Sequence, residues 1–224
     1  MNATLSQFVQ IPADISFLEG MLELPPNARG IVLFAHGSGS SRMSPRNNFV
    51  AEKLREGGVG TLLVDLLSDT EEAIYETRFD IPLLTRRLAT VAKWIAESRA
   101  ASDLPIGLFG ASTGGAAAIR LAASEPDSIA AVVSRGGRPD LAGPFALQSV
   151  RAPTLLIVGA EDRGVVDLNR TAYQELRCEK ELELVAGATH LFEEPGTLSR
   201  GAQLARRWFG RHLNADIGAF AFAR

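Results

Sequence analysis

Short apolar runs, separated by polar or amphipathic stretches, make up most of the chain. Five of them have the continuous apolar character of strands buried on both faces, and they lie at residues 31–34, 59–67, 106–109, 129–133 and 154–158. Residues 5–24 are more mixed and predict two early strands, which a turn at Pro25-Pro26-Asn27 closes. A last strand is expected near residues 181–185. These runs predict one extensive sheet.

Helical periodicity fills the intervals between the runs. Leu84, Leu88, Val91 and Ile95 follow the spacing of an amphipathic helix, and Asp80 before a proline has the form of its N-cap. Further helices are expected at residues 45–56, 116–123, 165–176 and 204–209. Strands that alternate with helices predict an α/β fold, with a mostly parallel twisted sheet covered by helices on both faces.

Several side chains that could act as a nucleophile, a base or an acid follow directly after predicted strands. His36, Ser112 and Asp162 come at three strand ends, and His190 follows a fourth strand after a short loop. In open parallel sheets, ligands bind beyond the carboxyl ends of the strands. We therefore expect residues that are far apart in sequence to meet at this edge of the sheet.

The segment Leu104–Ala118, LPIGLFGASTGGAAA, carries the most specific signal. A strand runs into Gly110-Ala111-Ser112-Thr113-Gly114 and then into a helix, which is the context of a nucleophile elbow. The tight turn requires residues without bulk beside the serine, and Gly110 and Gly114 meet that requirement. It would hold the serine hydroxyl at the sheet edge, next to a helix N-terminus that can receive negative charge.

A serine nucleophile needs a base, and the chain has three histidines. His190, on the loop after the last strand, is the best candidate. His36 is expected to shape the glycine-rich loop that follows it, and His212 lies among arginines, as a solvated surface residue would.

The orienting acid is predicted to be Asp162, which ends the strand before that of His190. Glu161 is adjacent and spacing alone does not exclude it. Asp65 and Asp140, also at strand ends, are weaker alternatives. The oxyanion hole is expected to use the backbone N–H of Thr113 and that of Ser38, with Gly37 as the alternative second donor.

The order serine, acid, histidine is that of α/β-hydrolases. With the elbow GASTGG, followed by TLLIVGAED and GATHLF, the chain from about Gly30 to Leu213 resembles the dienelactone hydrolase branch of that superfamily. The resemblance implies an α/β-hydrolase fold and ester hydrolysis. Dienelactone hydrolases carry a cysteine at the elbow, whereas this chain has Ser112, and Cys178 is expected to lie away from the site. A dienelactone substrate is therefore not implied.

Composition narrows the class of protein. The net charge of −3 and pI near 5.7 argue against nucleic-acid binding, and no apolar run approaches the ~20 residues that span a bilayer. The N-terminus lacks the pattern of a signal peptide, and a single cysteine suits a reducing compartment. We expect a cytoplasmic protein that forms one domain over residues 1–224, with no cofactor and no metal.

The expected activity is hydrolysis of small carboxylic esters or thioesters through an acyl-enzyme. Acyl transfer or peroxide formation on the same triad, and a non-enzymatic binding protein of this fold, are the alternatives. Ser134–Leu141 is too short for a helical cap, so an open site is expected. Arg135 and Arg138 on that loop either read an anionic group of the substrate or are surface arginines. Phe220 and Phe222 in the tail could pack on the domain or form a dimer contact.

Overall fold

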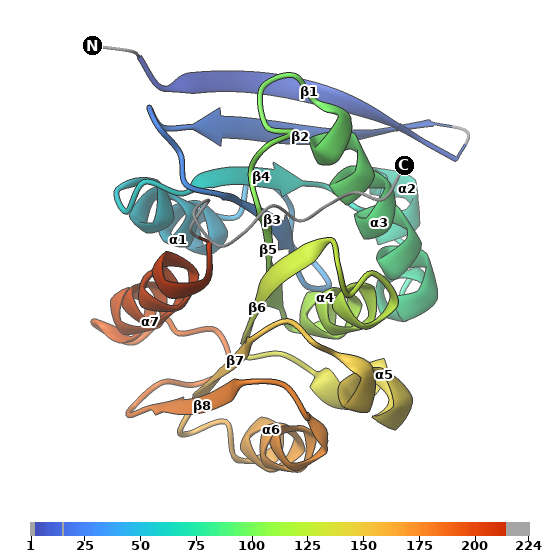
Figure 1. Ribbon diagram of the computed structural model, residues 1–224. Helices are drawn as coiled ribbons and strands as arrows, with labels where there is room; N and C mark the ends of the chain where they lie inside the picture. Colours follow the sequence, from blue (N-terminus) through green and yellow to red (C-terminus); the bar gives the residue numbers. More distant parts are fainter. Residues whose placement is uncertain (1–2, 15, 214–224) are drawn as a thin grey trace.

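A computed structural model describes residues 3–14 and 16–213, and the tail that carries Phe220 and Phe222 lies outside this part. Its centre is an eight-stranded sheet in the order β1-β2-β4-β3-β5-β6-β7-β8. The strands are β1 (Leu5–Ala13), β2 (Ser16–Leu24), β3 (Ile31–Ala35), β4 (Gly60–Val64), β5 (Ile106–Ala111), β6 (Ile129–Arg135), β7 (Thr154–Gly159) and β8 (Lys180–Val185). This arrangement confirms the predicted α/β class, as the ribbon shows (Figure 1).

The sheet is parallel from β4 to β8 and antiparallel only at its β1 edge. β1 and β2 form a hairpin with Leu5 opposite Leu24, and β2 pairs with β4 in the antiparallel sense. All remaining neighbours are parallel, with β5 between β3 and β6. The carboxyl ends of β3, β5, β6 and β7 therefore share one edge, which is where ligands bind in sheets of this kind.

Helices cover both faces of the sheet (Figure 1). The longer ones are α1 (Pro45–Arg55), α3 (Ile81–Glu97), α4 (Thr113–Ser124), α6 (Arg163–Glu175) and α7 (Thr197–His212). α1 and α7 pack on one face, around Val50, Leu54, Trp208 and Phe209. α3 and α4 cover the other face with the predicted stripe of α3, and the Asp80 carboxylate caps α3 by accepting the N–H of Leu83 at 2.9 Å.

Short helices occupy two stretches in which the sequence pattern predicts no helix. The segment between β4 and α3 contains α2 (Asp69–Glu72) and η1 (Thr77–Phe79), and the segment between β6 and β7 contains η2 (Pro139–Ala142) and α5 (Pro144–Ser149). One or two turns are too short to show helical periodicity, which explains why they were missed. None of the helices in the described ranges has the length and apolar character needed to cross a membrane.

An ion-pair network fastens the segment between β4 and α3 to the sheet. The Arg87 guanidinium on α3 binds both carboxylate oxygens of Glu71 at 2.7 Å, the carboxylate of Asp14 at 3.1 Å and the backbone carbonyl of Leu66 at 2.8 Å. The hydrogen bonds from Arg87 lower the pKa of Glu71 to about 2. The ionised carboxylate thus stabilises the folded state.

Replacing Glu71 with glutamine should reveal this contribution through its pH dependence. A carboxylate whose pKa is lower in the folded than in the unfolded state stabilises the fold above its unfolded pKa, and this stabilisation is lost as the pH falls toward about 2. Because Glu71 is partly exposed, we expect Glu71→Gln to cost about 1 kcal/mol at pH 7. In urea unfolding, the difference from the wild type should shrink at pH 3, whereas the exposed control Glu76→Gln should show no such difference. An equal cost at both pH values would contradict the assignment.

Candidate functional site

The turn between β5 and α4 is built by close contact between backbones. Ser112 has φ +49°, a left-handed conformation that is unusual for a residue with a side chain. A Cβ on Gly114 would overlap the carbonyl oxygen of Ala35 at the end of β3, and one on Gly110 would lie 2.5 Å from the Cα of Gly115. The two glycines are therefore required by the approach of β3, β5 and α4, and the turn presents Ser112, which is partly exposed.

A third glycine borders the serine side chain. A Cβ on Gly37, in the loop after β3, would lie 2.7 Å from Cβ of Ser112 and 3.5 Å from its Oγ. The loop after β3 thus passes directly beside the hydroxyl of Ser112. Any side chain at position 37 would compete with that hydroxyl for space.

His190 and Asp162 form a hydrogen-bonded pair at the same edge of the sheet. Nδ1 of His190 lies 2.7 Å from Oδ2 of Asp162, and both side chains are partly exposed. Asp162 is the N-cap residue of α6, yet its carboxylate makes no capping hydrogen bond to the helix. Glu161 instead interacts through its backbone N–H, which donates to the carbonyl of Ala188. Of the two adjacent carboxylates, it is that of Asp162 which contacts the imidazole.

The last residue of β6 connects Ser112 to this pair. The N–H of Ser112 donates to the carbonyl of Arg135 at 3.4 Å. The next residue, Gly136, has φ +52° and lies against the imidazole, because a Cβ there would be 3.7 Å from Nδ1 of His190. Two successive residues at the end of β6 thus contact Ser112 on one side and His190 on the other.

The two predicted oxyanion donors lie next to each other. Thr113 is the first residue of α4, so its N–H has no acceptor within the helix. The N–H of Ser38 donates to Oγ1 of Thr113 at 3.2 Å. This hydrogen bond ties the loop after β3 to the elbow, and it gives the N–H of Ser38 an acceptor inside the protein.

Charged side chains hold the loop after β3 in place. Asp65, directly after β4, binds the backbone N–H of Arg42 at 2.5 Å and also its guanidinium, while Nε2 of His36 lies 3.2 Å from Oδ1 of the same carboxylate. Burial alone would raise the pKa of Asp65, but the contacts with His36 and Arg42 keep it below the ordinary value. His36 thus shapes this loop, as predicted, and Asp65 contacts His36 rather than His190.

The segment between β4 and α3 reaches the loop from the other side. Glu72 accepts the N–H of Gly39 at 2.6 Å, and Arg78 lies 3.4 Å from the same carboxylate. A cavity of ≈ 10 Å³, large enough for about one water molecule, lies among these residues, and its lining includes Gly37, Ser38 and Thr113. Tyr75 and Phe79 pack their rings 4.9 Å apart on the outside of the segment and are exposed.

The remaining candidates lie elsewhere or have other partners. The Asp140 carboxylate pairs with Arg138 at 2.7 and 2.9 Å. Cys178 precedes β8, near Thr154 at the amino end of β7, and burial raises the pKa of its thiol.

The expectation that His212 is a solvated residue was wrong. Its side chain is only 12% exposed, and its ring packs 4.5 Å from that of Trp208, one helical turn earlier.

The surface interpretation of Arg135 was also wrong. The residue is 7% exposed and its side chain turns under the sheet edge toward α1, where Nη2 lies 3.4 Å from Oδ1 of Asn47. A charged residue at the start of a polar, glycine-rich loop gives no sequence signal for such burial.

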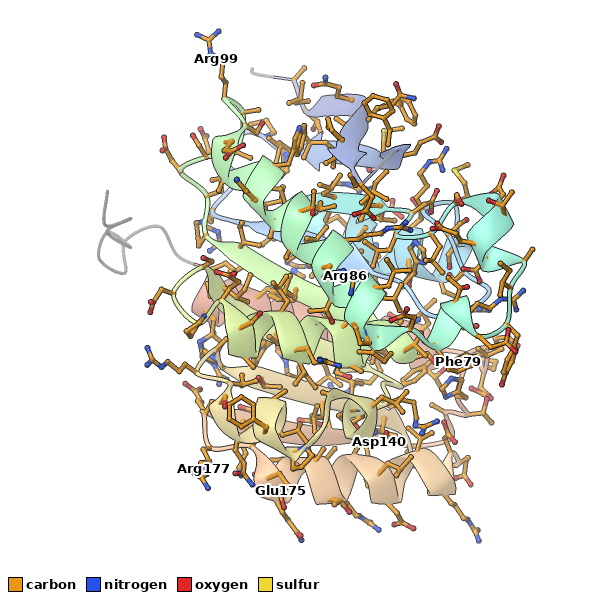
Figure 2. All side chains as sticks on the ribbon, turned by 90° about the vertical axis from the view of Figure 1, so that its right-hand side faces the viewer. Phe79, Arg86, Arg99, Asp140, Glu175 and Arg177 are labelled. Carbon is orange, nitrogen blue, oxygen red and sulfur yellow. The ribbon has the colours of Figure 1, made fainter. Side chains whose placement is uncertain are left out.

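Figure 2 shows Asp140, on the same connection, and Phe79 toward one edge of the molecule, with Arg99 at the opposite end. In the described residues, no group of three or more His, Cys, Asp or Glu side chains is arranged to hold a metal.

Comparison with known proteins agrees with this architecture. The family described as "Alpha/beta hydrolase domain" matches residues 28–206. The crystal structure of a dienelactone hydrolase from Anabaena variabilis is 49% identical, with a TM-score of 0.92, covering 95% of this chain and all of the other. Est1E from Butyrivibrio proteoclasticus shares the fold at 17% identity, with a TM-score of 0.79 over 92% of this chain and 98% of its own.

Two curated Mycobacterium tuberculosis proteins are 53% identical over 205 residues, which is 92% of this chain. They are provisionally named phosphoribosyl transferases, and the chain spans about half of their length (46%). That name therefore refers to much longer proteins. The profile match and the Anabaena structure both cover most of this chain, and they lead to the same conclusion. The chain belongs to the α/β-hydrolase family and is similar to dienelactone hydrolases.

Proposed function

We propose that the protein is a serine hydrolase that cleaves small carboxylic esters or thioesters through an acyl-enzyme. The observation that carries this proposal is the hydrogen-bonded His190–Asp162 pair, together with the left-handed Ser112 at the β5–α4 turn on the same edge of the sheet. A serine has little reason to occupy a strained turn unless its hydroxyl must be presented. The family to which the chain belongs, and its hydrolase neighbours, support the same chemistry.

In the proposed mechanism, Oγ of Ser112 attacks the carbonyl carbon of the ester and Nε2 of His190 accepts its proton. Asp162 holds the imidazole through Nδ1 and stabilises the imidazolium that forms. The imidazolium then returns the proton to the leaving alkoxide or thiolate as the bond to it breaks. A water molecule, deprotonated by His190, attacks the acyl-enzyme in the same way and releases the acid and free Ser112.

The negative charge on the carbonyl oxygen is stabilised by the N–H of Thr113 and a second donor on the loop after β3. Ser38 is our choice for the second donor, and its N–H must then exchange the hydroxyl of Thr113 for the oxyanion. The N–H of Gly37, which belongs to the residue beside Ser112, is the alternative. Loss of one such donor typically costs ~10²–10³ in kcat.

Replacing Ser112 with alanine should abolish ester hydrolysis and labelling by a fluorophosphonate probe. The change removes a hydroxyl from a partly exposed turn, so circular dichroism should report an unchanged fold. Cys178→Ser is the matched control: it should keep most activity, because this thiol is half-buried and its pKa is raised by burial. Mass spectrometry that finds the label on another residue would overturn the assignment of the nucleophile.

The two adjacent carboxylates give a matched pair of variants. Asp162→Asn removes the orienting charge from His190 and should lower kcat by several orders of magnitude, since loss of this acid can cost ~10⁴. Glu161→Gln should cost little, because Glu161 is exposed and contacts Ala188 through its backbone N–H. Steady-state kinetics on purified, folded variants decide between the two, and the reverse ranking would transfer the role to Glu161.

The acyl group of good substrates should be short. In the described residues, β6 is followed by two short helices rather than by a large cap that could enclose a long acyl chain. Long chains would then gain little of the ~0.8 kcal/mol available per buried CH₂. With 4-nitrophenyl esters, kcat/KM is expected to be highest from acetyl to butyryl and to fall at octanoyl. A steady rise with chain length would indicate an apolar channel and a lipase-like enzyme.

A further inference from the structure

Arg135 is a buried cation without a carboxylate partner. The residue is 7% exposed, and no carboxylate in the described residues pairs with it. Nη1 is buried without a hydrogen-bond partner, and Nη2 has only the 3.4 Å contact with Asn47. Burial, together with the charge of Arg46, lowers the pKa of Arg135 to about 10, so the guanidinium remains charged at neutral pH.

The cost of this arrangement is high. A guanidinium removed from water without a counter-ion loses several kcal/mol, and an apolar residue of similar length would avoid that loss. Arg87, the other buried arginine of the described chain, shows the usual solution, since it binds two carboxylates and a carbonyl. A residue that breaks this rule at the edge of a site points to a role in function.

Two aromatic rings offset part of the cost of burying this charge. The guanidinium carbon lies 5.8 Å from the ring centroid of Phe109 and 5.7 Å from that of Phe192. Phe109 belongs to β5, three residues before Ser112. Phe192 follows His190 by two residues and has φ +58°, so the backbone of this loop is itself strained. The cation therefore joins the strand of the nucleophile to the loop of the base.

We propose that Arg135 is a positioning residue that fixes the loop carrying His190 relative to Ser112 by holding Phe109 and Phe192 on one guanidinium. This role rests on the proposed function. The backbone at Arg135 contributes to the same positioning. The carbonyl of Arg135 accepts the N–H of Ser112, and the next residue, Gly136, borders the imidazole of His190. The attraction between a cation and aromatic faces is what a neutral side chain of the same length cannot replace.

The test compares Arg135→Met, which keeps the length of the stem, with Arg135→Lys, which keeps a cation. Displacement of a catalytic group by about 1 Å can cost ~10² in rate. Arg135→Met is therefore expected to lower kcat by about 10- to 100-fold on 4-nitrophenyl butyrate, with KM changed by less than about threefold. Arg135→Lys should recover most of the loss. The far-downfield proton resonance of the His190–Asp162 hydrogen bond should broaden or move in Arg135→Met and return in Arg135→Lys.

Thermal unfolding separates positioning from ordinary packing. Removing an unpaired buried charge should leave the Tm of Arg135→Met unchanged or higher, so activity and stability should diverge. Arg55→Met, a partly buried arginine on α1 that pairs with Glu23, is the control and should keep its kcat. Full kcat in Arg135→Met, or a kcat that falls only with Tm, would overturn the inference. If the wild type neither turns over esters nor labels at Ser112, the proposed function fails instead.

Discussion

The site depends on the absence of side chains where three backbones meet. The end of β3, the end of β5 and the first turn of α4 approach so closely that Gly110 and Gly114 have no room for a Cβ, and Gly37 has none because Ser112 fills the space. This contact fixes the serine without any side-chain hydrogen bond. A single methyl group at one of these positions would push apart elements that also form the centre of the sheet.

Around this contact, each connection at the sheet edge has its own local anchor. Asp65 holds the loop after β3 through Arg42 and His36, and Asp162 leaves the N-terminus of α6 uncapped to bind His190. Arg135, the last residue of β6, lies between the connection that follows β3 and the one that follows β7. Its buried guanidinium lies near the rings of both Phe109 and Phe192. The polar groups of the site are thus held by contacts of quite different physical kinds.

The sequence predicts the strands and the turn at Ser112 better than the side-chain contacts that surround them. Continuous apolar runs indicate buried parallel strands, and the glycines around Ser112 indicate a turn that only a close backbone contact would need. The pairing of Asp162 with His190 also follows from their positions after neighbouring strands. Burial of Arg135 and His212 could not be predicted, because it depends on rings supplied by Phe192 and Trp208 after the chain has folded. The hydrogen bond from Ser38 to Thr113 depends on one side-chain rotamer, which no sequence pattern specifies.

The segment between β4 and α3 contacts the loop after β3 through Glu72 and packs its aromatic pair outward. Arg87 on α3 holds this segment in place by binding the carboxylate of Glu71, and this contact involves no residue of the turn around Ser112. Such a segment can be lengthened, shortened or exchanged in evolution at little risk to the backbone contacts around Ser112. Variation in this stretch is thereby uncoupled from the glycine contacts that shape the turn, so related chains can differ here while the backbone beneath Ser112 stays the same.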